Sequence, residues 1–193
     1  MNPTTEAADA VVAADGAGVA AAAVLHRGGT AADMLLAEVV AHRQTQGWRV
    51  RGLLMTYPQP EAGCAGRMVL VDIASGAPFL VSQPMGSGST ACRGDPQGFA
   101  QASGVLRAAL ADAPDLVVVN RFGALEAEGG GFSAELLELL SEGIPVLTAV
   151  NERYLPAWQH FSGGAVVLSA ERAAVDEWLA VVLARDSGPA AAR

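Results

Sequence analysis

The sequence predicts an α/β domain of three layers, with a mainly parallel sheet and an antiparallel hairpin at one edge. Apolar runs of strand length alternate with segments of helical periodicity along most of the chain. Such alternation favours right-handed crossover connections and a parallel sheet that helices cover on both faces. The exception is a pair of apolar runs joined by Ser75-Gly76, whose short turn is typical of a hairpin. We expect one domain over residues 18–186, with flexible tails at 1–17 and 187–193, which are rich in Ala and Gly.

The first half of the chain predicts two strands, one helix and the hairpin. The continuous apolar run over 19–26 predicts a buried strand. Apolar residues three or four positions apart then predict a helix over 31–45, with Thr30 as its N-cap and Asp33 favourably placed near the positive end of its dipole. A second strand and the two hairpin strands are expected at 48–56, 67–73 and 78–83.

The second half of the chain alternates strands with helices more regularly. A loop rich in Gly and Ser is expected over 84–98, and Asp95-Pro96 is typical of a helix start. Helices are expected at about 96–113, 133–142, 156–161 and 170–185. Fully apolar strands, typical of a parallel sheet buried on both faces, are expected at 116–119, 144–150 and 165–168. The last helix has an amphipathic pattern formed by Val175, Trp178, Leu179, Val182 and Leu183.

The composition excludes several classes of function. All 12 cationic residues are Arg, and the sequence contains no Lys. The lack of Lys rules out Schiff-base chemistry, a lysine general base and a phosphate loop of the usual Lys-bearing kind. The formal net charge is −8 and the Arg residues are scattered, which argues against nucleic acid or an anionic membrane as the main partner.

The termini and the cysteines favour a cytoplasmic location. Residues 1–18 contain three acidic residues and no basic region before their Ala- and Val-rich stretch, so they do not resemble a secretory signal. No apolar run reaches the ~18 residues of a membrane span. Cys64 and Cys92 lie far apart and outside any CxxC pattern, which favours free thiols over a disulfide. The three His residues are too dispersed to predict a metal site.

Ligands of open α/β sheets bind at the carboxyl ends of the strands, which directs attention to three loops and to Asn151. The first loop contains Arg27, Gly28, Gly29 and Thr30 and lies where a phosphate loop would. Its glycines allow backbone N–H groups to converge near a helix N-terminus, although the GxxxxGK[ST] pattern is missing. An ordinary strand-to-helix turn is the alternative interpretation.

The second and third loops supply further candidates. The loop over 84–95 concentrates the donors that a tetrahedral oxyanion needs, and the alternative is a disordered surface loop. Its candidate ligand-binding residues are Ser87, Gly88, Ser89, Thr90, Cys92 and Arg93. In the third loop, over 120–131, Asn120 occupies the strand end where a hydrolase would carry a magnesium-binding acid, and Arg121 follows it. Glu126 and Glu128 are candidate acids or metal ligands, with a solvated acidic loop as the alternative.

Three blocks of sequence carry a resemblance to a known family. The segment LVVVNRFGALEAEGGGF at 116–132, with further blocks at 82–96 and 143–151, resembles an uncharacterised bacterial domain family often found beside molybdenum transport genes. That family is in turn similar to the thermophile-type P-loop nucleoside triphosphatases, with a degraded phosphate loop. The resemblance covers about 20–165 and implies a P-loop-NTPase-like fold and a link to molybdate. The first loop departs from the family pattern at 26–29.

Together these features predict a non-hydrolytic oxyanion-binding protein, accessory to molybdenum homeostasis, with molybdate or tungstate as the ligand. The missing Lys and the missing acidic residue, beside retained Gly- and hydroxyl-rich loops, support this interpretation. Two alternatives stay open. One is a nucleoside triphosphatase or phosphotransferase that uses Arg27 or Arg93 in place of Lys. The other is a pseudo-enzyme that binds a protein partner.

Three further expectations concern binding and assembly. Nucleotide affinity is expected to be weak, because no Lys meets the triphosphate charge. Arg93 is the only cation between Arg67 and Arg107, so Arg93→Ala is expected to weaken anion binding about ten- to a hundredfold. A homo-oligomer is expected, because the mean hydropathy is positive and the hairpin leaves a sheet edge to cover.

Overall fold

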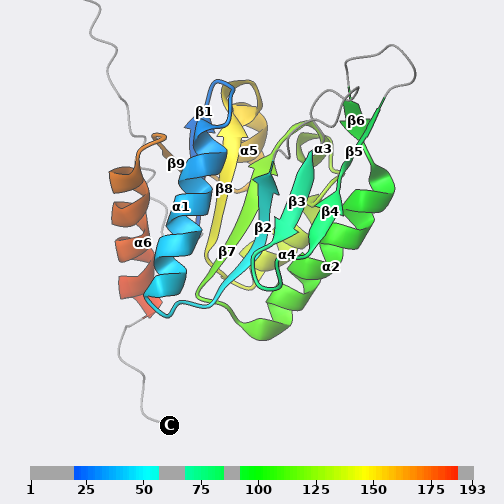
Figure 1. The fold of residues 1–193 in the computed structure, drawn as a ribbon. Helices are drawn as coiled ribbons and strands as arrows, with labels where there is room; N and C mark the ends of the chain where they lie inside the picture. Colours follow the sequence, from blue (N-terminus) through cyan, green and yellow to red (C-terminus); the bar gives the residue numbers. More distant parts are fainter. Residues whose placement is uncertain (1–19, 57–67, 85–91, 187–193) are drawn as a thin grey trace, which may run out of the picture.

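The computed structural model describes residues 20–56, 68–84 and 92–186, and these form a seven-stranded sheet between two layers of helices (Figure 1). The strands follow the order β4-β3-β2-β7-β8-β1-β9. Their bounds are β1 (Ala21–His26), β2 (Val50–Thr56), β3 (Val69–Asp72), β4 (Pro78–Leu80), β7 (Leu116–Phe122), β8 (Val146–Asn151) and β9 (Val166–Leu168). A separate two-stranded sheet pairs β5 (Ser82–Pro84) with β6 (Cys92–Gly94).

The sheet is parallel except at one edge. Strands β2, β7, β8, β1 and β9 pair in parallel, in registers such as Val24 with Ala149 and Val50 with Leu116. Strand β3 pairs antiparallel with β2, and β4 pairs antiparallel with β3. The predicted parallel sheet with an antiparallel edge hairpin is therefore confirmed.

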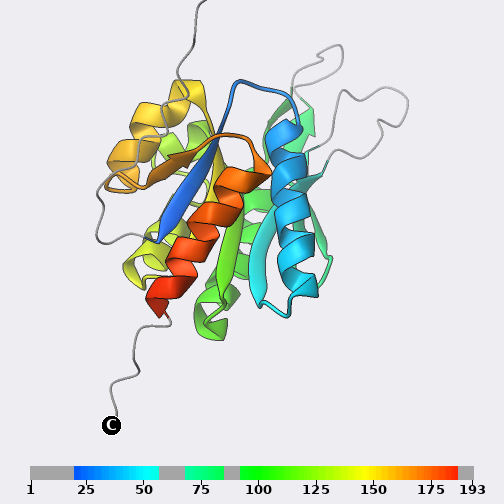
Figure 2. The ribbon, with the colours of Figure 1, turned by 90° about the vertical axis from the view of Figure 1, so that its left-hand side faces the viewer.

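Helices cover both faces of the sheet. Helices α1 (Ala31–Thr45) and α6 (Arg172–Asp186) lie side by side on one face, as Figure 2 shows. Helices α2 (Pro96–Asp112), α4 (Ser133–Ser141) and α5 (Leu155–Phe161) pack on the other face. The predicted apolar stripes are buried, since Leu36 of α1 and Leu179 of α6 are almost inaccessible to solvent. Among the described residues, no helix is both long enough and apolar enough to cross a membrane.

Four details differ from the sequence prediction. Strand β7 does not end at residue 119 but continues to Phe122 after a register shift, because Phe122 is buried against the rings of Trp158 and Phe161. The expected loop over 84–98 is interrupted by β6, and a short helix α3 (Ala124–Ala127) follows β7. Thr30 does stand at the N-cap of α1, but its side chain makes no capping hydrogen bond.

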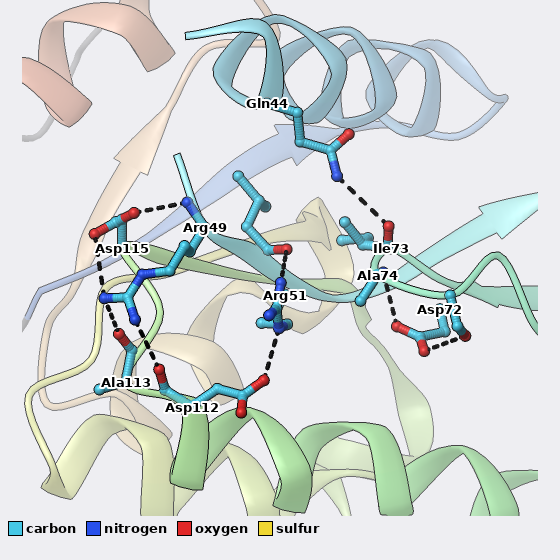
Figure 3. A network of polar contacts seen from close by, with 11 residues as sticks. Gln44, Arg49, Arg51, Asp72, Ile73, Ala74, Asp112, Ala113 and Asp115 are labelled. Carbon is cyan, nitrogen blue, oxygen red and sulfur yellow. Dashed lines mark hydrogen bonds and ion pairs between the residues drawn. The ribbon is translucent and has the colours of Figure 1, made fainter. Parts of the chain in front are cut away.

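A network of hydrogen bonds lies at the amino-terminal ends of the parallel strands β2 and β7 (Figure 3). The Arg49 guanidinium donates to the carbonyl oxygens of Asp112 and Ala113, at 3.1 and 2.7 Å, and the Arg49 N–H donates to Asp115. Arg51 donates to the Asp112 carboxylate at 2.8 Å. These contacts join the end of α2 to the starts of β2 and β7. Two Arg residues of the chain therefore have structural partners far from the carboxyl ends of the strands.

Candidate functional site

A cleft of about 720 Å³ opens at the carboxyl ends of β1, β2, β7 and β8. This edge of the sheet lies at the top of Figure 1, toward which the arrowhead of β8 points. The volume falls within the range of small-molecule sites, roughly 300–1,000 Å³. The polar residues that line it include Arg27, Asn120, Arg121, Glu126, Asn151 and Arg153. The apolar residues that line it include Met55, Met68, Leu70, Phe99, Leu125 and Phe132.

The cleft brings together many of the residues that the sequence singled out, although they come from distant segments. Arg27 and Gly28 follow β1, whereas Asn151 ends β8. The residues Ser87, Gly88, Ser89 and Thr90 lie outside the described part of the chain. The backbone of Cys92 and Arg93 forms β6, and Gly94 at the end of β6 lines the cleft, but the side chains of Cys92 and Arg93 are outside the described part.

Asn120 is the most unusual residue of the cleft. Its side chain is buried, with 3% of the residue exposed, and neither Oδ1 nor Nδ2 has a hydrogen-bond partner among the described residues. An unpaired polar group in a protein interior typically costs about 1–3 kcal/mol. Such groups are rare in native structures, and each one calls for an explanation. Asn120 therefore lines the cleft with an amide whose two polar atoms are buried and have no partner among the described residues.

Arg121, the next residue of β7, binds the first turn of α1. Its Nε and Nη2 donate to the two carboxylate oxygens of Asp33 at 3.0 and 2.6 Å, and Nη2 also donates to the carbonyl oxygen of Gly29 at 3.2 Å. Asp33 is almost completely buried, so this ion pair is shielded from water. Sequence reasoning placed Asp33 near the helix dipole but missed its pairing with Arg121.

The turn between β1 and α1 is ordered by His26. The Gly28 N–H donates to His26 Nδ1 at 3.2 Å, and Gly28 and Gly29 have positive φ angles of 130° and 71°, which favour glycine. Burial of His26, followed by the positive charge of Arg121, lowers the pKa of the imidazole. The neutral ring accepts at Nδ1 and therefore carries its proton on Nε2. The Gly28 N–H is thus used within the turn itself.

Two exposed Arg residues lie at the rim of the cleft. Arg27 donates from Nε to Glu152 at 3.0 Å, with 82% of the Arg27 side chain exposed. Arg153 stacks on the ring of Tyr154, with 4.5 Å between the guanidinium carbon and the ring centroid. Asn151 accepts the Arg153 N–H and caps the 3-10 helix η1 (Glu152–Tyr154). Sequence reasoning missed Arg153 and Tyr154, because a polar segment after a strand carries no motif.

Glu126 is buried and accepts hydrogen bonds from the backbone, so the alternative of a solvated acidic loop is wrong for this residue. Its Oε2 accepts the Gly123 N–H at 3.0 Å and its Oε1 accepts the Phe132 N–H at 3.1 Å. Burial raises the pKa of Glu126, and the backbone hydrogen bonds oppose that shift. Glu128 is exposed, as a solvated loop residue would be. In the described ranges, no three His, Cys, Asp or Glu side chains gather as a metal site requires.

Comparisons with known proteins agree with the fold and indicate a family. The "Molybdenum import ATP-binding protein ModC 2" of Bradyrhizobium diazoefficiens is 37% identical over 158 residues, a match that covers 81% of this chain. The chain spans only 18% of the length of that relative. The "Solution Structure of a Human Cancer-Related Nucleoside Triphosphatase" covers 90% of this chain and 100% of its own, with a TM-score of 0.60 and 18% identity. This likeness confirms the expected NTPase-like fold.

A family model matches most of the described chain, over residues 21–178. The match spans the strands β1, β2, β7 and β8 that build the cleft, together with the helices on both faces of the sheet. The chain therefore belongs to the family described as "Protein of unknown function (DUF2478)".

Proposed function

We propose that this chain is a non-hydrolytic binding protein for an oxyanion, and that the cleft at the carboxyl ends of the strands is its site. The observation that carries the proposal is the set of polar residues that line the cleft: the exposed Arg27 and Arg153, and on β7 Asn120 where a hydrolase would need a carboxylate. Charged donors at a concave site favour an anionic ligand, because such an ion accepts hydrogen bonds.

The proposal that the protein does not hydrolyse its ligand depends on the acidic residues of the cleft. Glu126 is the only carboxylate among the described residues that line the cleft, and both of its oxygens accept backbone N–H groups. A carboxylate held in this way is poorly placed to activate water or to hold magnesium. The sequence also lacks a Lys that could reach the β- and γ-phosphates of a nucleotide.

Molybdate and tungstate are the inorganic anions that we propose first. The relative that shares 37% identity is named for molybdenum import, and Gly94, near the end of the Gly- and hydroxyl-rich loop over 84–95, lines the cleft. We include Ser87, Ser89, Thr90 and Arg93 in this proposal as a second group of donors.

Calorimetry with molybdate, tungstate, sulfate and phosphate tests the proposal. Arg27→Ala and Arg153→Ala should each weaken binding about three- to tenfold, since each removes one solvent-exposed charge. Arg51→Ala is the matched control, because Arg51 also pairs with one carboxylate but lies at the opposite end of the sheet. Unchanged affinity in both rim variants would contradict the proposed site. If both rim variants keep their affinity and Arg93→Ala weakens binding about ten- to a hundredfold, the anion binds at the loop over 84–95 alone.

A nucleoside triphosphatase or phosphotransferase is the second candidate, and the NTPase-like fold favours it. Incubation with magnesium and nucleoside triphosphates distinguishes the two. Steady turnover well above background, lost in Arg27→Ala and retained in Arg51→Ala, would overturn the non-hydrolytic proposal. Glu126→Gln is a poor control for this assay, because it also disturbs the loop that Glu126 closes.

A further inference from the structure

A second pocket, of about 370 Å³, lies beside the cleft. Its volume is at the lower end of the range of small-molecule sites, roughly 300–1,000 Å³. Helix α2 lines it with Pro96, Ala100, Ser103 and Arg107, which are three or four positions apart and therefore lie along one face of the helix. Leu125 of α3 also lines it. The proposed function does not use this pocket.

The hydroxyl of Ser103 opens to the pocket without a partner. Ser103 is 6% exposed, and its Oγ makes no hydrogen bond within the described part of the chain. A serine inside a helix can donate to the carbonyl oxygen four residues earlier, as Ser141 of α4 does to Leu137 at 2.7 Å. The described polar atoms that are enclosed without a partner belong to other residues, so the Ser103 Oγ is accessible to a molecule in the pocket.

Arg107, one turn further along α2, is the only charged residue among the described residues that line the pocket. Its Nη1 donates to Glu135 of α4 at 2.8 Å, and its side chain is 58% exposed. Within the described ranges, Nε and Nη2 of Arg107 have no partner. These two groups form the edge of a guanidinium that can hold a carboxylate through two parallel hydrogen bonds. Arg121 binds Asp33 through the same edge.

The pocket also has an apolar part, formed by Phe99 and Leu125. Phe99 is partly buried, and Leu125 is 40% exposed although its side chain is large and apolar. Gly94 lies against both, since a Cβ at this position would be 3.2 Å from the Phe99 ring and 3.4 Å from Leu125. Covering apolar surface of this kind favours binding of a ligand with an apolar body.

We propose that this pocket binds a small monocarboxylate with an apolar body, such as an arylalkanoic acid or a medium-chain fatty acid. The carboxylate pairs with Nε and Nη2 of Arg107 and accepts the hydroxyl of Ser103, and the apolar body lies against Phe99 and Leu125. A single negative charge suits the pocket, because Glu135 already offsets part of the charge of Arg107. This site goes beyond the proposed function and uses neither of the Arg residues at the rim of the cleft.

Calorimetry on the full chain with four probes tests the ligand class. Phenylacetate and octanoate carry the carboxylate and an apolar body, phenylacetamide lacks the charge, and acetate lacks the body. At least one of the first two should bind about tenfold more tightly than both phenylacetamide and acetate, because a hydrogen bond to a charged group is stronger than one to a neutral group. Equal binding of phenylacetamide or of acetate would overturn the proposal.

Variants of α2 test the place of binding. Ser103→Ala should weaken binding of the acid about three- to tenfold and leave the melting temperature unchanged or higher, because the hydroxyl bonds to nothing and Ala favours a helix. Arg107→Gln should weaken binding about tenfold or more. Ala100→Phe should fill the pocket and abolish binding. Ala108→Phe is the matched control on the same helix, because Ala108 is exposed and does not line the pocket.

The outcomes also separate this site from the cleft. Arg27→Ala and Arg153→Ala should bind the acid as the wild type does, and a loss in either would place the acid in the cleft and overturn the inference. Equal affinity of Ala100→Phe and Ala108→Phe would place it elsewhere, with the same consequence. If neither acid binds the wild type, the inference is wrong, while the inorganic anions decide the proposed function independently. Arg107→Gln removes the partner of Glu135, so Ser103→Ala and Ala100→Phe keep the test independent of that ion pair.

Discussion

Asp33 and Arg121 form a two-point ion pair that fastens the first turn of α1 to the end of β7. The bonds are 3.0 and 2.6 Å long, and the two side chains are 4% and 29% exposed. Bidentate pairs of this kind are geometrically specific and, when shielded from water, they leave a costly charge if one partner is removed. Because Arg121 also reaches the Gly29 carbonyl oxygen, the pair positions the turn that borders the cleft.

Removal of either partner should destabilise the protein more than the loss of a surface ion pair does. We expect Asp33→Ala and Arg121→Ala each to lower the free energy of unfolding by about 2–4 kcal/mol. The double variant should cost less than the sum of the two, with a coupling energy above about 1 kcal/mol. Urea denaturation of the four proteins measures this cycle, and strictly additive effects would contradict it. Arg27 and Glu152 provide the exposed comparison, for which the coupling should stay below about 1 kcal/mol.

Glu126 should stabilise the loop over 123–132 through its two backbone hydrogen bonds. In Glu126→Gln one carboxylate oxygen becomes an NH₂ group, which then faces a backbone N–H. We expect a loss of about 1–3 kcal/mol in the free energy of unfolding. Glu128→Gln is the matched control, because Glu128 is an exposed neighbour, and its change should stay within about 0.5 kcal/mol. Equal stability of the two variants would show that the Glu126 hydrogen bonds contribute nothing.

Two glycines of α2 should respond to alanine in opposite directions. A Cβ on Gly98 would lie 2.0 Å from the carbonyl oxygen of Leu80, so Gly98→Ala should separate α2 from the edge of the sheet and cost about 1–3 kcal/mol or more. Gly104 has open space around the same position, and Gly104→Ala should stabilise the helix by about 0.5–1 kcal/mol. Thermal unfolding measures both, and a shift of the same sign in the two variants would contradict the expected packing.

Periodicity and strand polarity predicted the layers of this fold and the place of its cleft. The apolar runs that end at His26 and Asn120 are strand-length and fully apolar, and parallel strands bring their carboxyl ends to one edge, so the meeting of Arg27, Asn120 and Asn151 was predictable. The pairing of Asp33 with Arg121 was not, because 88 residues separate them and no sequence pattern links the two positions.

Sequence patterns also did not predict which polar side chains are buried. Glu126 stands in an acidic stretch that is typical of a solvated loop, yet it is buried because two backbone N–H groups converge on it. The unpaired state of Asn120 depends on which neighbours pack around β7, and no local signal encodes that. Homo-oligomerisation and the anion-binding role of Arg93 stay predictions.

His26 should make the stability of the protein fall in mildly acidic solution. Burial and the nearby Arg121 guanidinium place the pKa of the folded state below the usual value of 6.5. Above that pH the imidazole is neutral in both states and contributes no dependence on pH. As the pH falls below about 6.5, the unfolded chain takes up a proton that the folded protein resists, so the free energy of unfolding decreases. One such group contributes at most about 1.4 kcal/mol per pH unit.

His26→Asn isolates this contribution. The Asn side chain can accept the Gly28 N–H in place of Nδ1 and does not titrate, so the variant should lose less stability than the wild type between pH 7 and pH 5. His160→Asn, at an exposed position of α5, should follow the wild type throughout. Urea denaturation at several pH values gives the three curves. Parallel curves for wild type and His26→Asn would mean that His26 takes up its proton equally readily in the folded and unfolded states.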